Sequence, residues 1–348
     1  MIRPLCLATL LLVAPLAAQQ TERFTLAGSE VAIYNLVGAL SVVGGNGPEV
    51  VVNVTRSGLD AGRLTVDHFP VRGLPALRIV FPGDRIVYPA MGRHSNTQLT
   101  IREDGTWGGG DWDRHRDGSH QIRISGDGDG LEASARMDIT VPAGRKVRLF
   151  VGVGSVDIRN VDGTLLVDVA SANITSSATQ GNFILGTGSG DIEVSNHDGG
   201  LSLDTGSGDI AVTTQKNGAL NIDTGSGSVR TSGITASTIK IDTGSGDIRL
   251  GDVTATRASL ETGSGSIEAR FRTPVEDLSV ETGSGDVLLR LPDGLNVTVD
   301  LETSSGDLTV DFPVQLIHKE DSSLRGRIGD GRGQIRVESG SGDISLLK

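Results

Sequence analysis

Residues 201–212 read Leu-Ser-Leu-Asp-Thr-Gly-Ser-Gly-Asp-Ile-Ala-Val, and the fold is predicted from the pattern of this segment. Apolar and polar residues alternate on both sides of the Gly-Ser-Gly segment, which is the period of a β-strand with one buried face. Glycine lets the backbone turn sharply, so the stretch is predicted to form two short strands joined at a glycine corner. No segment of this region has the period of a helix.

The same stretch returns at a nearly constant step. The tetrapeptide Thr-Gly-Ser-Gly begins at residues 187, 205, 224, 243, 262 and 282, so the steps are 18, 19, 19, 19 and 20 residues. A weaker copy begins at Thr303 and a last copy at Ser339, 21 and 36 residues further on. Regular steps of this length are typical of solenoid proteins, because so short a unit buries its apolar face only against neighbouring units.

Two columns of apolar residues are expected to face inward when these units stack. One column lies two residues before the Thr and the other lies five residues after it. They consist of Leu185, Leu203, Ile222, Ile241, Leu260, Val280, Leu301 and Val337, and of Ile192, Ile210, Val229, Ile248, Ile267, Val287, Leu308 and Ile344. The chain is therefore predicted to be all-β and to fold as a parallel β-helix, or β-solenoid, of about 19-residue turns.

In such a fold each strand pairs in parallel with the equivalent strand one turn later. We expect a right-handed coil, by analogy with parallel crossover connections, and a ladder of Thr hydroxyls at the corner. A β-propeller and a β-sandwich are the alternatives. Propeller blades are about twice as long as these units, and sandwich strands do not repeat at a fixed step, so the solenoid is favoured.

The chain is expected to have three parts. Residues 1–18 are predicted to be a secretory signal peptide, because Arg3 precedes a short apolar run that ends in small residues; a membrane anchor is the alternative. Residues 19–150 are predicted to be an irregular, strand-rich start and cap of the solenoid, with a polar insertion at 92–120. A separate β-sandwich is the alternative for this part. Residues 151–348 form the regular repeats.

Composition excludes several classes of function. The formal net charge is -12, and it becomes -13 once Arg3 is removed with the signal peptide, which argues against nucleic-acid binding. The one cysteine, Cys6, lies in the predicted signal peptide, so the mature chain can form neither an internal disulfide nor a cysteine metal site. No later segment is long and apolar enough to span a membrane.

Laid out in these units, the chain resembles the bacterial putative-adhesin domain family, whose function is unknown. The resemblance covers about residues 30–348 and is carried by TGSGDI at residues 187–192, 205–210 and 243–248, TGSGDV at 282–287, and VPAGRKV at 141–147. Ser228 and Ser266 depart from the family pattern, in which Asp is usual, and so does the Trp-containing insertion. The resemblance implies a β-helical fold and a surface or envelope role, and it transfers no catalytic residues.

Acidic residues form two further columns, which are expected to point outward. One precedes the Thr and the other follows the glycine corner. They consist of Asp204, Asp223, Asp242, Glu261, Glu281 and Glu302, and of Asp191, Asp209, Asp247, Asp286, Asp307 and Asp343. Stacked carboxylates repel one another, and calcium would relieve that repulsion. The calcium-binding nonapeptide repeat has a different period, so we favour the interpretation that these side chains accept turn N–H groups and keep the rod soluble.

The polar insertion contains the candidate ligand-binding residues. Trp107, Trp112, His115 and His120 lie close together in the sequence, among several aspartates. A tryptophan ring is a typical stacking platform and histidine a typical metal ligand, so a sugar or metal site is one hypothesis. The other hypothesis, which we favour, is a solvated loop whose geometry nothing fixes.

These features favour a non-enzymatic, exported protein of the cell surface or envelope, located in the periplasm, on the cell surface or outside the cell. Its solenoid face is expected to bind a surface polysaccharide or protein. The alternatives are a polysaccharide lyase or hydrolase of the β-helix type, and a purely structural envelope component. No phosphate-binding, dinucleotide-binding, zinc-protease or nucleophile-elbow motif occurs in a suitable setting, so we assign no catalytic, cofactor-binding or metal-binding residue.

Overall fold

The structure, a computed structural model, describes residues 21–108 and 119–348, so the predicted signal peptide at 1–18 lies outside the described residues. The described chain consists of strands and two short 3-10 helices, η1 (Ala61–Arg63) and η2 (Pro89–Met91). The strands of the first half are β1 (Thr21–Leu26), β2 (Glu30–Gly45), β3 (Val50–Ser57), β4 (Thr65–Asp67), β5 (Ala76–Val80), β6 (Arg85–Val87), β7 (Asn96–Ile101), β8 (His120–Ser125), β9 (Leu131–Glu132), β10 (Ser134–Pro142), β11 (Arg145–Arg159) and β12 (Asp162–Ser189). Those of the second half are β13 (Ile192–Ser207), β14 (Ile210–Lys216), β15 (Ala219–Ser226), β16 (Val229–Thr243), β17 (Ile248–Thr262), β18 (Ile267–Phe271), β19 (Asp277–Thr282), β20 (Val287–Arg290), β21 (Val297–Thr303), β22 (Leu308–Val310), β23 (Gln315–Lys319), β24 (Ser323–Ile328), β25 (Gly333–Ser339) and β26 (Ile344–Leu347).

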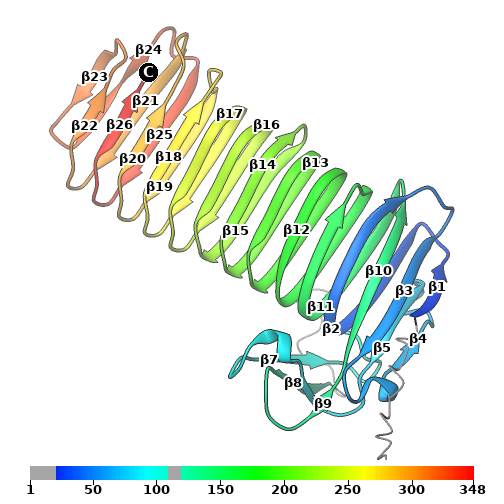
Figure 1. The fold of residues 1–348 in the computed structure, drawn as a ribbon. Helices are drawn as coiled ribbons and strands as arrows, with labels where there is room; N and C mark the ends of the chain where they lie inside the picture. The colour runs from blue at the N-terminus through cyan, green and yellow to red at the C-terminus, as the bar shows by residue number, and fades with distance from the viewer. Residues whose placement is uncertain (1–20, 109–118) are drawn as a thin grey trace, which may run out of the picture.

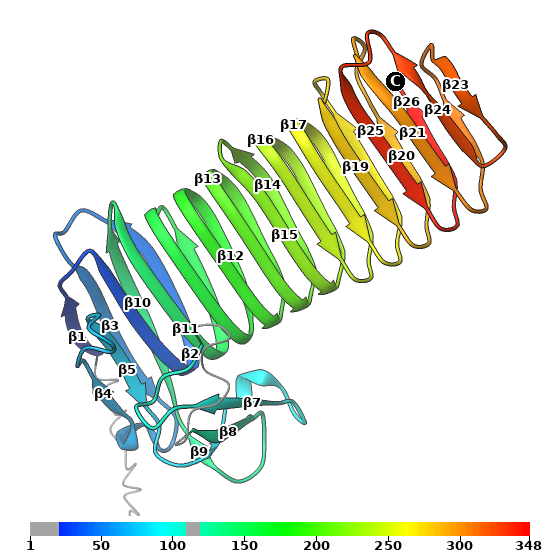
Figure 2. The same ribbon diagram turned by 180° about the vertical axis from the view of Figure 1, so that it is seen from behind.

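Successive coils lie side by side along a rod and pair as parallel strands (Figures 1 and 2). Ile210 pairs with Val229, and Val229 pairs with Ile248, which is the alignment that the step of 19 residues predicts. The predicted parallel β-helix is therefore confirmed, whereas the hand of its coil stays a prediction.

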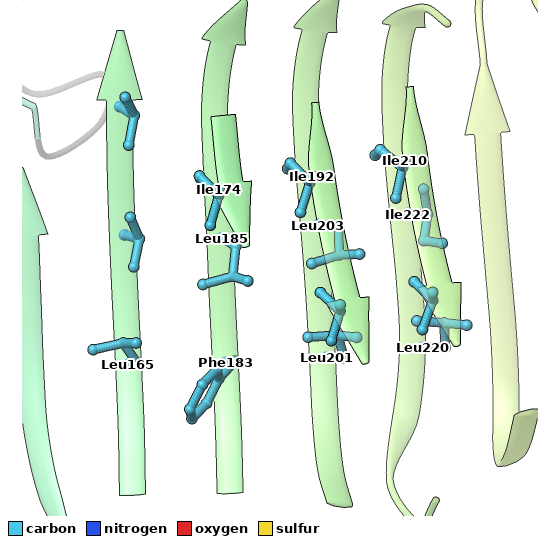
Figure 3. Packing of buried hydrophobic residues seen from close by; sticks show 14 of the residues in the cluster. Leu165, Ile174, Phe183, Leu185, Ile192, Leu201, Leu203, Ile210, Leu220 and Ile222 are labelled. Atoms are coloured by element: carbon cyan, nitrogen blue, oxygen red, sulfur yellow. The ribbon is translucent and has the colours of Figure 1, made fainter. Parts of the chain in front are cut away.

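Each coil has two strand layers, and the apolar columns meet between them. We call the layer before the glycine corner face A and the layer after it face B; β15, β19, β21 and β25 belong to face A, and β14, β18, β20 and β26 to face B. Figure 3 shows the leucine and isoleucine side chains of successive coils arranged in rows. Ile210 and Ile248 on face B and Ile241 on face A are fully buried, so one thin aliphatic core follows the stacked coils.

The Thr of the repeat is buried at the corner, and its hydroxyl stabilises the turn. Thr205 Oγ1 donates to the carbonyl of Gly190 over 3.1 Å, and Thr262 Oγ1 donates to the carbonyl of Gly246 over 3.0 Å. The expected ladder from one Thr hydroxyl to the next is therefore wrong. Coils rise by about 4.8 Å, which is too far for a direct hydroxyl–hydroxyl bond, whereas the corner carbonyl of the preceding coil lies within reach.

The glycines at the corner are required by how closely the coils approach. Gly246 has a φ of +148°, and a Cβ on it would lie 2.1 Å from the carbonyl oxygen of Gly227 in the preceding coil. Both the backbone conformation and the contact exclude a larger residue.

At the N-terminal end, β2 forms a coil that pairs in parallel with β11, from Glu30↔Lys146 to Val43↔Arg159. β10 lies between β2 and β3, parallel to β2 and antiparallel to β3, and β1 pairs with β3. Strands β6 to β9 form a separate four-stranded sheet that contains the described part of the insertion. The boundary expected at residue 150 falls inside β11, and the division into domains stays a prediction.

The coils at the C-terminal end do not follow chain order. Thr282 pairs with Ser339, and Ser339 pairs with Thr303, so β25 lies between β19 and β21. After β21 the chain forms β23 and β24, which pair antiparallel with each other, and β24 also pairs antiparallel with β21. It then returns past β21 and occupies the place beside β19. The prediction that each strand pairs with the equivalent strand one turn later is therefore wrong at this end.

Three consecutive coils place a polar side chain inside the core at the second corner, which is the turn from the face B strand to the face A strand of the next coil. Thr179, His197 and Gln215 are in register and almost completely buried. Thr179 Oγ1 lies 3.0 Å from His197 Nδ1, and His197 Nε2 lies 3.2 Å from the carbonyl of Gly200. Since a carbonyl only accepts, the neutral ring carries its proton on Nε2 and accepts the Thr179 hydroxyl at Nδ1. Burial lowers the pKa of His197, because the charged ring would lose its hydration.

This lowered pKa predicts an acid-sensitive core. As the pH falls below the ordinary histidine pKa of 6.5, the unfolded chain takes up a proton at His197 that the folded chain does not, so stability decreases. Between pH 7.5 and 5.5 the wild type should lose about 1 kcal/mol more free energy of unfolding than His197→Gln, measured by urea denaturation. Equal losses in the two proteins would show that His197 does not titrate across folding.

The close approach at the corner predicts a strong effect of a single methyl group. Gly246→Ala should lower the free energy of unfolding by about 2–4 kcal/mol, because it adds a clash to a strained φ. Gly62→Ala is the matched control, since a Cβ there meets no atom within 4 Å. Urea denaturation followed by circular dichroism measures both variants, and similar midpoints would contradict the steric argument.

Candidate functional site

The outer surface of face A carries a continuous column of carboxylates, which we call the acidic column. Its members occupy the position before the Thr and pair in register from coil to coil. In stacking order they are Asp204, Asp223, Asp242, Glu261, Glu281, Glu338 and Glu302. Burial and the neighbouring Asp223 raise the pKa of Asp204, as expected for like charges stacked at the spacing of one strand. This column therefore presents one negative charge per coil along the rod.

The second acidic column, after the glycine corner, has a structural role. Asp209 Oδ1 accepts the backbone N–H of Ser228 over 2.8 Å, and Asp247 Oδ1 accepts that of Ser266 over 2.9 Å. These hydrogen bonds lower the pKa of Asp209 and of Asp247, since they favour the ionised carboxylate. The interpretation of these side chains as acceptors of turn N–H groups is confirmed, with the donor belonging to the next coil.

Within residues 21–108 and 119–348, no group of three or more His, Cys, Asp or Glu side chains is placed to hold a metal ion. In the same residues, no helix is long and apolar enough to cross a membrane.

The structure puts the residues of the insertion in different surroundings. Trp107 is only 6% exposed and packs edge-on against Tyr34, with ring centroids 5.5 Å apart. His120 is exposed at the start of β8, while Trp112 and His115 lie outside the described residues. Trp107 is therefore enclosed, and the assignment of Trp107, Trp112, His115 and His120 to a ligand-binding loop stays a prediction.

Trp107 is part of an aromatic cluster on the outer side of face A. Tyr34 stacks on Phe150 with a centroid distance of 4.5 Å and an interplanar angle of 8°, and both rings are buried. They stand in the column that carries carboxylates further along the rod, since Phe150 pairs with Asp168 one coil later. This cluster was not predicted from the sequence. The available signal was an aromatic residue at an outward position in two coils, where the repeats have Asp or Glu.

Comparison with known proteins gives one family and two solved structures. The family model described as Toastrack DUF4097 matches residues 131–347. A putative cell adhesion protein from Clostridium sporogenes ATCC 15579 is similar at 9% sequence identity, with 94% of this chain and 99% of that chain covered and a TM-score of 0.21. A putative adhesin from Bacteroides fragilis NCTC 9343 is similar at 11% identity, with 96% and 99% covered and a TM-score of 0.35. TM-scores this low carry no weight for function. No curated protein sequence matches the chain.

The buried position of Trp107 predicts a structural rather than a binding phenotype. Trp107→Ala should lower the free energy of unfolding by about 3 kcal/mol, because it opens a cavity against Tyr34. His120→Ala, at an exposed position, should leave stability unchanged within about 0.5 kcal/mol. Urea denaturation of both variants checks this, and a Trp107→Ala protein as stable as the wild type would contradict it.

Proposed function

The chain belongs to the Toastrack DUF4097 family, and we propose that it is an exported, non-enzymatic binding scaffold of the bacterial cell surface or envelope. Its proposed partner is a surface polysaccharide or protein that lies along the outer faces of the solenoid. Location in the periplasm, on the surface or outside the cell belongs to the same proposal. The observation that carries it is the register of the outward side chains, which repeat once per coil along both faces.

The register supports binding because it fixes the spacing of polar groups before any partner arrives. Lys240 on face A pairs with Asn221 and Ser259, and the acidic column runs beside them. Each strand in the middle of the rod is hydrogen-bonded on both edges, so these side chains project from a rigid support. A rigid surface loses little conformational entropy on binding, which favours an extended partner with its own repeat.

The distribution of acidic residues favours binding over hydrolysis. A glycoside hydrolase uses two carboxylates that face each other across the bond to be cleaved. Here the carboxylates of Asp204, Asp223 and Glu261 follow one another on the same face, one per coil, and do not oppose each other across a cleft. This arrangement suits repeated contacts with a partner. The glycan-array experiment described next also tests the enzymatic alternative.

The proposal predicts that the protein is exported, and that it binds surface glycans or proteins without cleaving them. The full-length chain, expressed in a bacterium and recovered from the cell envelope or the medium, should start near Gln19 by mass spectrometry. Purified protein should bind members of an array of cell-surface glycans and envelope proteins, in the presence or absence of calcium. Incubation with the bound glycans should release no reducing ends or unsaturated products.

Three outcomes would decide against the proposal. Cleavage of any array glycan by the wild-type protein would establish the lyase or hydrolase alternative. Retention of the chain in the cytoplasm with residues 1–18 intact would contradict export. Absence of binding across the whole array, with the protein found in the envelope, would favour a purely structural role.

A further inference from the structure

The outer surface of face B carries a run of arginines from β16 to β20. Four consecutive coils each present one exposed arginine there, and we call this set the arginine track: Arg230, Arg249, Arg270 and Arg290. Arg230 pairs with Arg249, and Arg270 pairs with Arg290, so each pair lies on adjacent strands. Glu268, which pairs with Arg249 and lies two residues before Arg270, is the acidic residue within the track. The track therefore consists of two pairs, with Arg270 and Arg290 two positions further along their strands than Arg230 and Arg249. Within each pair the two residues are one coil apart, about 4.8 Å.

Two arginines of the track form ion pairs, and the other two do not. Arg230 lies 3.2 Å from Asp209, and Arg249 lies 2.8 Å from Asp247. Arg270 and Arg290 form no ion pair within 4.0 Å in the part of the chain that the structure describes. Two guanidinium groups directly opposite each other on neighbouring strands repel. Carboxylates lie near this pair, since Glu268 precedes Arg270 by two residues on β18 and Asp252 interacts electrostatically with Arg270. Among the described residues, neither carboxylate forms an ion pair with Arg270 within 4.0 Å.

The unpaired arginines open into a surface cavity at the second corner. The cavity has a volume of about 770 Å³, and its charged lining residues are Arg270, Arg290, Arg272, Lys348 and one acid, Asp252. Arg272 is held by Asp252 at 3.0 Å, and Lys348 is held by Asp293 at 3.1 Å. These two exposed ion pairs neutralise Arg272 and Lys348, so the guanidinium groups of Arg270 and Arg290 are the ones available to an incoming anion.

We propose that the arginine track and this cavity bind an anionic polysaccharide, through the carboxylate or sulfate groups that it carries along its length. The planar fork of a guanidinium matches the geometry of both oxyanions. A linear polymer suits the site because the cations recur once per coil on an open strand face. This inference rests on the proposed function and names the ligand class and the face that it uses.

The rest of the surface restricts where such a polymer lies and of what kind it is. The acidic column on face A repels a polyanion, which confines binding to face B. The net charge of -12 opposes the dense phosphate charge of duplex nucleic acid, whereas a polyuronate carries only one carboxylate per sugar. The observations therefore favour an anionic glycan over a nucleic acid.

The test compares charge removal on the two faces of the full-length protein. The probes are polygalacturonate, dextran sulfate, neutral dextran and single-stranded DNA, with affinity measured by biolayer interferometry at several salt concentrations. The variants are R290A and the double variant R270A/R290A. The matched control is R257A, which removes an exposed arginine of face A that also has no ion pair within 4.0 Å in the described chain. Because these side chains are exposed, all variants should keep the wild-type unfolding temperature, and this is measured first.

The wild type should bind at least one of the two anionic polysaccharides and not dextran. R270A/R290A should weaken that binding at least about tenfold, with R290A between it and the wild type, while R257A stays within about twofold. The slope of log affinity against log salt should become shallower by about one for each arginine of the track that is removed.

Three results would overturn the inference: no binding of either anionic polysaccharide by the wild type, equal weakening by R257A, or wild-type affinity in the double variant. Preference for DNA over both polysaccharides would overturn the choice of ligand class. Binding of neutral glycans or proteins on the array, without binding of polyanions, would leave the proposed scaffold function standing while this inference fails.

Discussion

The in-register backbone pairing of successive coils is the constraint on which the rest of this structure depends. It brings equivalent atoms to the spacing of adjacent strands, about 4.8 Å, along the whole solenoid. At the corner this leaves no room for a Cβ between Gly227 and Gly246, so glycine recurs there. The same spacing brings the corner carbonyl within reach of the next Thr hydroxyl, and it brings Asp209 Oδ1 to the N–H of Ser228. The repeat motif is thus a set of contacts made between one coil and the next.

The constraint that builds the core also organises the surface. An outward residue that recurs in the repeat becomes a column, so acidic residues accumulate on face A, whereas arginines accumulate on face B from β16 to β20. A globular protein needs loops from distant parts of the chain to gather charges in this way. Here a charged residue that recurs at one position of the repeat is sufficient, and the rigid backbone holds the resulting charges at a fixed interval. This is the physical basis for treating the faces of the rod as binding surfaces.

Both ends of the solenoid are closed by strands taken out of chain order. β10 lies between β2 and β3, and β25 lies between β19 and β21. In each case an antiparallel strand continues the sheet outward, β3 at one end and β24 at the other. A solenoid needs capping units with altered structure, because its end coils have only one neighbour. The inserted strands β10 and β25 are each paired on both edges, so they connect the caps to the stacked coils by backbone hydrogen bonds.

The coil could be predicted from the amino-acid sequence alone. The alternation around residues 201–212 and the step of about 19 residues were sufficient to predict the alignment of Ile210, Val229 and Ile248, and the role of Asp209 at the corner. These features depend on contacts between neighbouring copies of one motif. Because the motif recurs at a regular step, its repetition is visible in the sequence. The tertiary structure alone decided the position of β25, the burial of Trp107 against Tyr34, and the convergence of Arg270, Arg290 and Lys348 on one cavity. Those features join segments that are not copies of the repeat. The distance between such segments in the sequence does not indicate that they pack together, so only the folded structure shows their association.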